Sequence, residues 1–97
     1  MADKAETPEN RLKRLVMRSK RRGIREMDLI LGAFADRHLA ALSPEELDLY
    51  ERFLGENDHD LYGWVTGYLQ VPPEYLGLIE RIRAGANLPG AGADISN

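Results

Sequence analysis

The segment DHDLYGWVTGYL, residues 58–69, carries the most regular hydrophobic pattern in this sequence. Its apolar residues stand at positions i, i+3, i+4, i+7 and i+8, which is the spacing of one face of an α-helix and not the alternation of a β-strand. They are Leu61, Trp64, Val65, Tyr68 and Leu69. The spacing therefore predicts a helix that is capped by Asn57 or Asp58, ends before Pro72 and buries all five side chains.

Four other segments show the same helical spacing, whereas Val, Ile and Thr nowhere alternate with polar residues as they do in strands. Their apolar positions are Leu12, Leu15 and Val16; Met27, Ile30, Leu31, Phe34, His38 and Leu39; Leu47, Tyr50, Phe53 and Leu54; and Tyr75, Leu78, Ile79, Ile82 and Ala86. Ser43-Pro44-Glu45-Glu46 is typical of a capping box that starts a helix. Because the connections are short, the sequence predicts an all-α fold, a compact five-helix bundle.

The 97 residues suffice for one hydrophobic core and hence one domain. We expect a flexible N-terminus over residues 1–8, a single five-helix domain over residues 9–86, and a flexible C-terminal tail over residues 87–97, which is rich in glycine and small residues. No segment approaches the apolar length that spans a bilayer, so no membrane insertion is expected. The absence of cysteine excludes disulfides and sulfur-ligated metal sites.

Charge is distributed unevenly along the chain. Residues 1–25 contain nine Lys or Arg and three Asp or Glu, although the whole chain has a net charge of −3. A basic first helix is one route to nucleic-acid binding, because Lys and Arg neutralise phosphates. However, this helix lacks the interleaved aromatic residues on which bases stack. A small nucleic-acid-binding or regulatory module therefore remains the alternative to a protein-binding role.

The residues that enzymes need are scarce. His38 and His59 are the only histidines, no cysteine nucleophile exists, and no glycine-rich phosphate loop follows a strand. His59 lies at the start of a predicted helix without a histidine partner one turn on, which favours a solvated position over a metal site. We expect no catalytic residues, no metal and no bound cofactor, and hence a protein that is not an enzyme.

The segment RSKRRGIREMD, residues 18–28, joins the first two predicted helices. Gly23 should end the first helix in a left-handed conformation, and Glu26 and Asp28 suit the positive end of the next helix dipole. On this interpretation Glu26 is only a first-turn carboxylate. It does not explain why three arginines crowd the turn, whereas a protein interface would use both the arginines and the close approach that glycine permits.

Two motifs in the chain resemble those of a known family. The first is Arg22-Gly23-Ile24-Arg25-Glu26, continued by Met27-Asp28, and the second is Asn57-Asp58-His59-Asp60-Leu61-Tyr62-Gly63-Trp64. From about residue 11 to 83 the chain resembles the SdhE-like FAD assembly factors of succinate dehydrogenase. The resemblance implies a five-helix chaperone that binds the flavoprotein subunit of that enzyme, and in bacteria often of fumarate reductase, and promotes covalent attachment of FAD to a histidine there. FAD is then the partner's cofactor.

The resemblance also implies which residues contact the partner. Arg22, Gly23 and Glu26 are the expected principal contacts, with Arg21, Arg25 and Asp28 as their neighbours. Mitochondrial relatives carry a presequence, which this chain lacks, so the resemblance implies a bacterial cytoplasmic protein.

Overall fold

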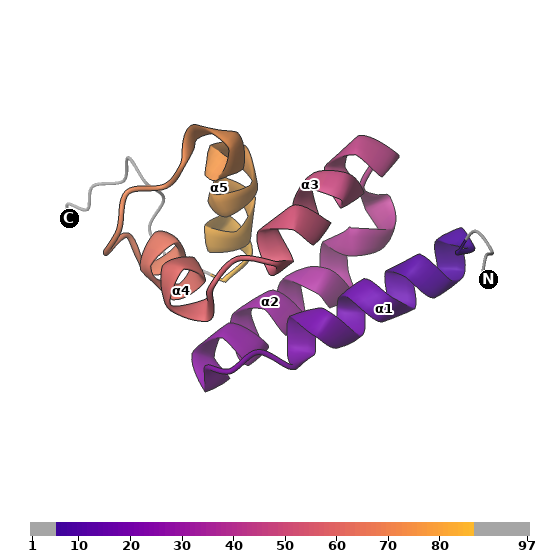
Figure 1. Cartoon of the computed structure of the whole chain (residues 1–97), viewed down its shortest axis with the longest axis horizontal. Coiled ribbons are helices and arrows are strands. Elements are labelled where there is room, and N and C mark those ends of the chain that lie inside the picture. The colour runs from indigo at the N-terminus through magenta and orange to yellow at the C-terminus, as the bar shows by residue number, and fades with distance from the viewer. Residues whose placement is uncertain (1–5, 87–97) are drawn as a thin grey trace.

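The computed structural model of the chain describes residues 6–86, over which the chain forms only helices. Their order is α1 (Pro8–Lys20), α2 (Arg25–His38), the 3-10 turn η1 (Leu39–Ala41), α3 (Pro44–Leu54), α4 (Asp58–Thr66), the 3-10 turn η2 (Pro73–Tyr75) and α5 (Leu76–Gly85). The helices α1 and α2 lie side by side, and α4 and α5 pack together at the far end from the start of α1 (Figure 1). The predicted all-α five-helix fold is confirmed.

The predicted domain, residues 9–86, lies within this range, whereas the two flanking segments that were expected to be flexible lie partly or wholly outside it. Residues 1–5 and the predicted tail, 87–97, are outside the described residues. Of the segment expected to be flexible, Thr7 accepts a hydrogen bond from the Asn10 N–H at 3.1 Å, and Pro8 opens α1. The predicted capping box is present at the start of α3, where Ser43 and Glu46 exchange hydrogen bonds of 2.8 and 3.1 Å.

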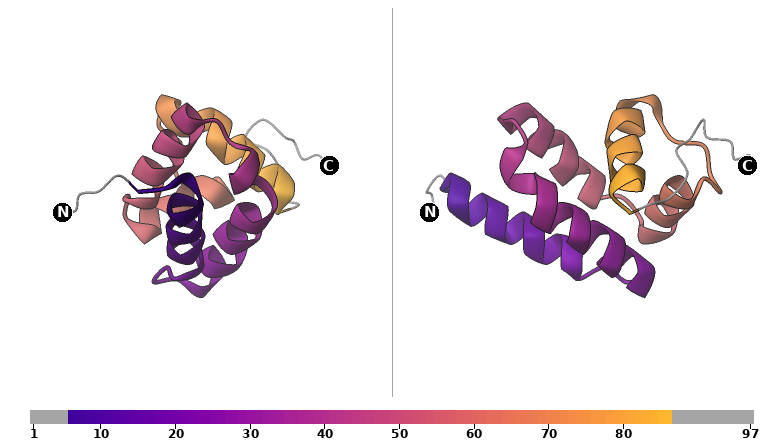
Figure 2. Two further views of the ribbon diagram at one scale, coloured as in Figure 1. Left: turned by 90° about the vertical axis from the view of Figure 1, so that its right-hand side faces the viewer. Right: turned by 180° about the vertical axis from the view of Figure 1, so that it is seen from behind.

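A chain of aromatic rings ties the helices together in the core. Phe34 of α2 lies 5.7 Å from Tyr50 of α3, and Phe53 of α3 lies 6.3 Å from Trp64 of α4 and 5.3 Å from Tyr75 of η2, all between ring centroids. Turning the molecule shows the helices arranged around this shared interior (Figure 2). The rings therefore link α2, α3, α4 and η2, and burying them supplies much of the hydrophobic stabilisation.

One buried hydrogen bond fastens α1 to this core. The hydroxyls of Ser19 and Tyr50 lie 2.6 Å apart, and the Ser19 hydroxyl also donates to the Leu15 carbonyl at 2.8 Å. Burial raises the pKa of Tyr50 to about 12, so the phenol stays neutral at ordinary pH.

The helix α4 is shorter than its hydrophobic pattern predicts. It ends at Thr66 because Gly67 adopts a left-handed conformation with φ of 85°. The expectation that Tyr68 and Leu69 are buried is therefore wrong: their side chains are 87% and 40% exposed. The chain folds back, and the Leu69 N–H donates to the Gly63 carbonyl at 2.9 Å, so that Leu69 covers Gly63 instead of continuing the helical face.

Gly23 does not end α1 as predicted. The helix ends at Lys20, two residues earlier than a terminating glycine at position 23 requires, and Gly67 is the one glycine with positive φ among residues 6–86. The reason that position 23 holds a glycine must therefore lie in its contacts rather than in its backbone conformation.

Candidate functional site

The turn between α1 and α2, residues 21–24, is built around an arginine that points inward. The Arg22 Nε donates to Asp58 Oδ1 at 2.8 Å, and its Nη2 donates to the Leu54 carbonyl at 2.8 Å. Only 10% of this side chain is exposed. Leu54 is the last residue of α3 and Asp58 the first of α4, so the guanidinium bridges both helix ends, where helix dipoles favour a cation and an anion respectively.

Gly23 completes the attachment of this turn to α4. Its N–H donates to Asp58 Oδ2 at 2.7 Å, so the two carboxylate oxygens of Asp58 hold two consecutive residues of the turn. A Cβ at position 23 would lie 3.1 Å from Oδ2, which is tighter than an ordinary contact. A glycine at position 23 thus allows the Asp58 carboxylate to come close to the backbone of the turn.

The charge of Asp58 is stabilised by these contacts. Burial opposes ionisation, but the Gly23 N–H, the Arg22 guanidinium and nearby His59 outweigh it and hold the Asp58 pKa below its ordinary value of 3.8. A second carboxylate, Asp28 in the first turn of α2, accepts a hydrogen bond from the Arg22 N–H. The turn is therefore held by carboxylates from the starts of two helices.

The six residues expected to contact a partner fall into two groups. Arg22 is largely buried and Asp28 partly buried, and the two are hydrogen-bonded to each other, whereas Arg21, Gly23, Arg25 and Glu26 are exposed. The structure therefore brings all six together at one turn, but only the second group presents an open surface.

Sequence reasoning missed the role of Asp58. Either Asn57 or Asp58 was expected to cap α4; the cap is Asn57, whose side chain accepts from the His59 N–H at 2.8 Å. This leaves the Asp58 carboxylate for the turn. The sequence feature that could have indicated this role is the position of Asp58 in the second motif. In the structure the two motifs meet at this residue.

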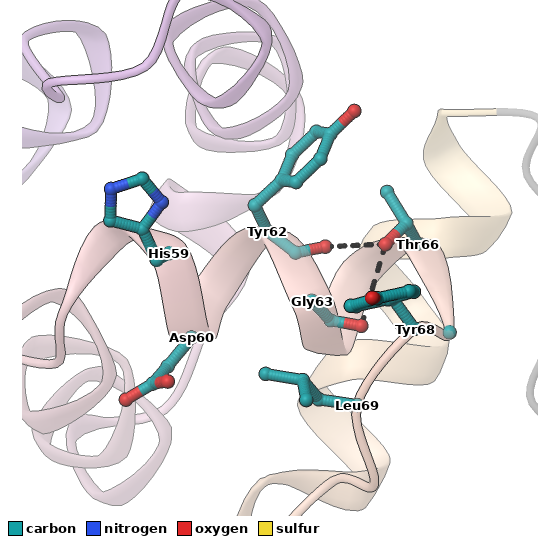
Figure 3. A pocket seen from close by; sticks show the side chains of 8 residues that line it. His59, Asp60, Tyr62, Gly63, Thr66, Tyr68 and Leu69 are labelled. Atoms are coloured by element: carbon teal, nitrogen blue, oxygen red, sulfur yellow. Dashed lines mark hydrogen bonds between the residues drawn. The ribbon is translucent and has the colours of Figure 1, made fainter.

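The outer face of α4 forms an open groove of about 780 Å³ (Figure 3). Its lining residues are His59, Asp60, Tyr62, Gly63, Thr66, Gly67, Tyr68 and Leu69. The Thr66 hydroxyl donates to the Tyr62 carbonyl at 2.7 Å. This groove also escaped sequence reasoning, which had assigned Tyr68 and Leu69 to the core.

Residues 6–86 contain no group of three His, Cys, Asp or Glu side chains that could hold a metal ion. Within the same range, no helix combines the length and apolar character needed to cross a membrane.

Comparison with known proteins identifies the family. Residues 13–86 match the family described as flavinator of succinate dehydrogenase. The chain belongs to this family. Similar proteins include two named succinate dehydrogenase assembly factor 2, mitochondrial. The one from Meyerozyma guilliermondii is 47% identical over 68 residues, covering 70% of this chain and 50% of the relative. The one from Debaryomyces hansenii is 50% identical over 60 residues, covering 62% and 42%.

These relatives bear on several expectations. The matched region spans half or less of each relative's length. The family description confirms the resemblance drawn from the two motifs and agrees with an assembly factor rather than an enzyme, and it gives no support to the nucleic-acid alternative.

The expectation of a bacterial cytoplasmic protein is wrong on this comparison, because the relatives are named as mitochondrial proteins and come from fungi. It rested on the N-terminal residues alone, and a targeting segment is separate from the folded domain on which the family match depends.

Proposed function

We propose that this chain binds the flavoprotein subunit of succinate dehydrogenase and promotes covalent attachment of FAD to it. The observation that carries the proposal is the family match over residues 13–86, a range that includes the whole of α2 to α5. The relatives are named assembly factors of the same enzyme. The chain supplies a binding surface, and the reacting groups, a histidine and the flavin, belong to the partner.

We assign the contact to the exposed residues of the turn and of the start of α2, which together form the exposed part of this region: Arg21, Gly23, Arg25 and Glu26. Its mixed charge suits a folded protein surface with both acidic and basic groups. A binding partner favours whichever domain arrangement of the flavoprotein it binds best, and only by that difference in affinity. Holding the histidine nitrogen aligned with the flavin 8α carbon would raise the rate of bond formation without a catalytic group from this chain.

The ion pairs of α1 argue against nucleic-acid binding. Arg11 lies 2.7 Å from Asp48 and 3.2 Å from Glu51, and Arg14 lies 2.8 Å from Glu51 and 2.7 Å from Glu6. Phosphates would have to compete with carboxylates already in place. Two of the basic residues on the first helix, Arg11 and Arg14, are therefore already paired with carboxylates within the fold.

The proposal is tested by co-expressing the flavoprotein subunit with and without this chain and measuring in-gel flavin fluorescence after denaturation. We expect covalent flavin to rise when the chain is present. The variant Glu26→Lys should weaken binding to the flavoprotein at least about tenfold, because it reverses an exposed charge within the assigned contact.

The matched control is Glu45→Lys, which removes an exposed carboxylate from the first turn of another helix, α3. Each variant should lose about 0.3–1 kcal/mol of folding stability through the helix dipole. Equal flavoprotein binding by both variants would show that Glu26 is only a first-turn carboxylate.

We extend the proposal to two finer points. The flavoprotein of fumarate reductase is proposed as a second partner, and the same co-expression assay with that subunit tests it separately. FAD is proposed to be held by the partner and not by this chain. Titrating FAD with the isolated chain should then leave flavin fluorescence unchanged, and saturable quenching would contradict this point.

A further inference from the structure

We infer that Asp58 is a positioning residue, whose carboxylate holds Arg22 and Gly23 so that the exposed part of the turn meets the flavoprotein already ordered. The inference rests on the proposed function and deepens it. It also assigns Arg22 an internal role: its guanidinium holds the interface in shape rather than forming it.

The turn is held by hydrogen bonds to carboxylates rather than by a helix cap of its own. The N-cap of α2 is Ile24, whose side chain makes no capping hydrogen bond. The backbone N–H groups of Arg22 and Gly23 donate instead to Asp28 and Asp58, the latter at 2.7 Å. Asp58 belongs to a different helix, so the shape of the turn depends on how α4 packs against it.

Two of these contacts share one carboxylate, that of Asp58. One oxygen of Asp58 accepts from the Arg22 side chain at 2.8 Å and the other from the Gly23 backbone at 2.7 Å. Charge-assisted hydrogen bonds of this kind are stronger than neutral ones. The side chain of Arg22 and the backbone of Gly23 are therefore fixed together, and Arg22 is anchored again by the Leu54 carbonyl at 2.8 Å.

Gly23 also points to Asp58 as the residue that positions the turn. Position 23 does not have the positive φ that only glycine adopts easily. A Cβ there would press on Asp58 Oδ2 at 3.1 Å. The close approach of Asp58 thus explains why position 23 is a glycine, while the exposed side of Gly23 remains open to a partner.

An ordered turn matters because a flexible one must be immobilised on binding, which reduces affinity. If Asp58 is changed to Asn, the amide keeps one acceptor oxygen and replaces the other by NH₂. Whichever way the amide is oriented, either the Arg22 guanidinium or the Gly23 N–H then faces a donor instead of an acceptor. The turn should loosen while the hydrophobic core stays intact.

The experiment measures flavinylation of the purified flavoprotein subunit at increasing concentrations of the full-length chain. For Asp58→Asn we expect the half-saturating concentration to rise about tenfold, because the free-energy cost of ordering the turn then reduces the affinity for the flavoprotein. The rate of flavinylation at saturation should be unchanged. Amide hydrogen exchange in the free chain should speed up at Arg22 and Gly23 and stay unchanged in the core of α3. A residue that mattered only for global stability would change exchange throughout.

The matched control is Asp60→Asn. Asp60 is an exposed carboxylate in the same first turn of α4. Asp60→Asn therefore changes the interaction with the helix dipole as Asp58→Asn does, but leaves the contacts of Arg22 and Gly23 in place. Arg22→Lys is a second variant, which keeps the charge but loses the two-pronged geometry. Arg22→Lys and Asp58→Asn should break the same Arg22–Asp58 contact. The double variant should therefore bind the flavoprotein little worse than either single variant.

The outcomes separate the two proposals. If the unaltered chain fails to stimulate flavinylation, the proposed function fails and this inference falls with it. If the unaltered chain works and Asp58→Asn behaves like Asp60→Asn in both half-saturation and exchange, only the inference is overturned. Should Asp58→Asn not fold, unchanged half-saturation for Arg22→Lys overturns the inference equally.

Discussion

Two turns of this molecule, residues 21–24 after α1 and residues 67–72 after α4, are held in different ways. The first is held by hydrogen bonds that its residues donate to charged groups on other helices, chiefly the Asp58 carboxylate. The second is held by backbone shape, because Gly67 has a φ of 85°. The first displays charged side chains and the second displays Tyr68 and Leu69. Charge should therefore control the first turn and sterics the second.

A charged residue also contacts the second turn, but it is buried and lies on α5. Arg83 of α5 is 5% exposed, and its Nε donates to the Val65 carbonyl at 2.7 Å. This satisfies a carbonyl that the end of α4 would leave without a helical partner. A Cβ at position 67 would overlap the Arg83 Nη2 atom. Gly67 is thus constrained twice, by its φ and by the arginine behind it.

Among the substitutions within the two turns, the largest effect is expected from Gly67→Ala. An L-residue in the left-handed region loses about 1–2 kcal/mol, and displacing Arg83 adds to this, so we expect a loss of about 2–3 kcal/mol in the free energy of unfolding. Urea denaturation followed by helical circular dichroism measures it.

Two other glycines serve as controls for Gly67→Ala. At Gly77 in α5 an added Cβ meets nothing within 4 Å, so Gly77→Ala should stabilise by about 0.5–1 kcal/mol. Gly23→Ala should lose no more than about 1 kcal/mol, because only the contact with Asp58 is strained. If Gly23→Ala destabilised as much as Gly67→Ala, the proposed difference between the turns would be wrong.

An intermediate effect is expected from acid. The Asp58 pKa is lowered in the fold, so its contribution is fully present above its ordinary value of 3.8 and is lost as pH falls through its lower folded value. Glu51, paired with Arg14, has its pKa lowered in the same direction from 4.5. The chain should therefore lose stability progressively as pH falls below about 5.

The comparison between the turns is sharpened by repeating this titration on variants. Asp58→Asn should reduce the slope of stability against pH by up to about 1.4 kcal/mol per pH unit below pH 4. The substitution removes a carboxyl that takes up a proton when the chain unfolds in this pH range. Gly67→Ala should shift the whole curve downward and keep its slope. An unchanged slope for Asp58→Asn would mean that Asp58 titrates alike in the folded and unfolded chain.

These turns also show what the sequence could predict. The Ser43 capping box depends on residues three apart and was predicted correctly. The helical spacing of Leu61, Trp64 and Val65 was sufficient for the fold class, and all three are buried. Helical spacing does not reveal where a helix stops, however. Gly63 and Gly67 look alike in the sequence, yet the first lies within α4 and the second ends it.

The orientation of Arg22 lay beyond sequence reasoning for a different reason. Its partner, Asp58, is 36 residues away, and the pairing exists only once α4 has packed near the turn. The motif predicted which residues gather at one place, but not which of them face inward. Contacts between distant charged residues therefore need the structure, whereas caps and hydrophobic faces do not.

The smallest effect is expected from Tyr68→Ser. Tyr68 completes the predicted hydrophobic face of residues 61–69, yet its side chain lies outside the core, so we expect a change within about 0.5 kcal/mol. Tyr75→Ser is the matched control: Tyr75 is 2% exposed, its hydroxyl donates to Glu56 at 2.8 Å, and its removal should lose about 3–5 kcal/mol. Thermal unfolding compares the two variants. A large loss for Tyr68→Ser would mean that α4 continues through Gly67 in solution, and the contrast between a turn held by charge and a turn held by shape would then disappear.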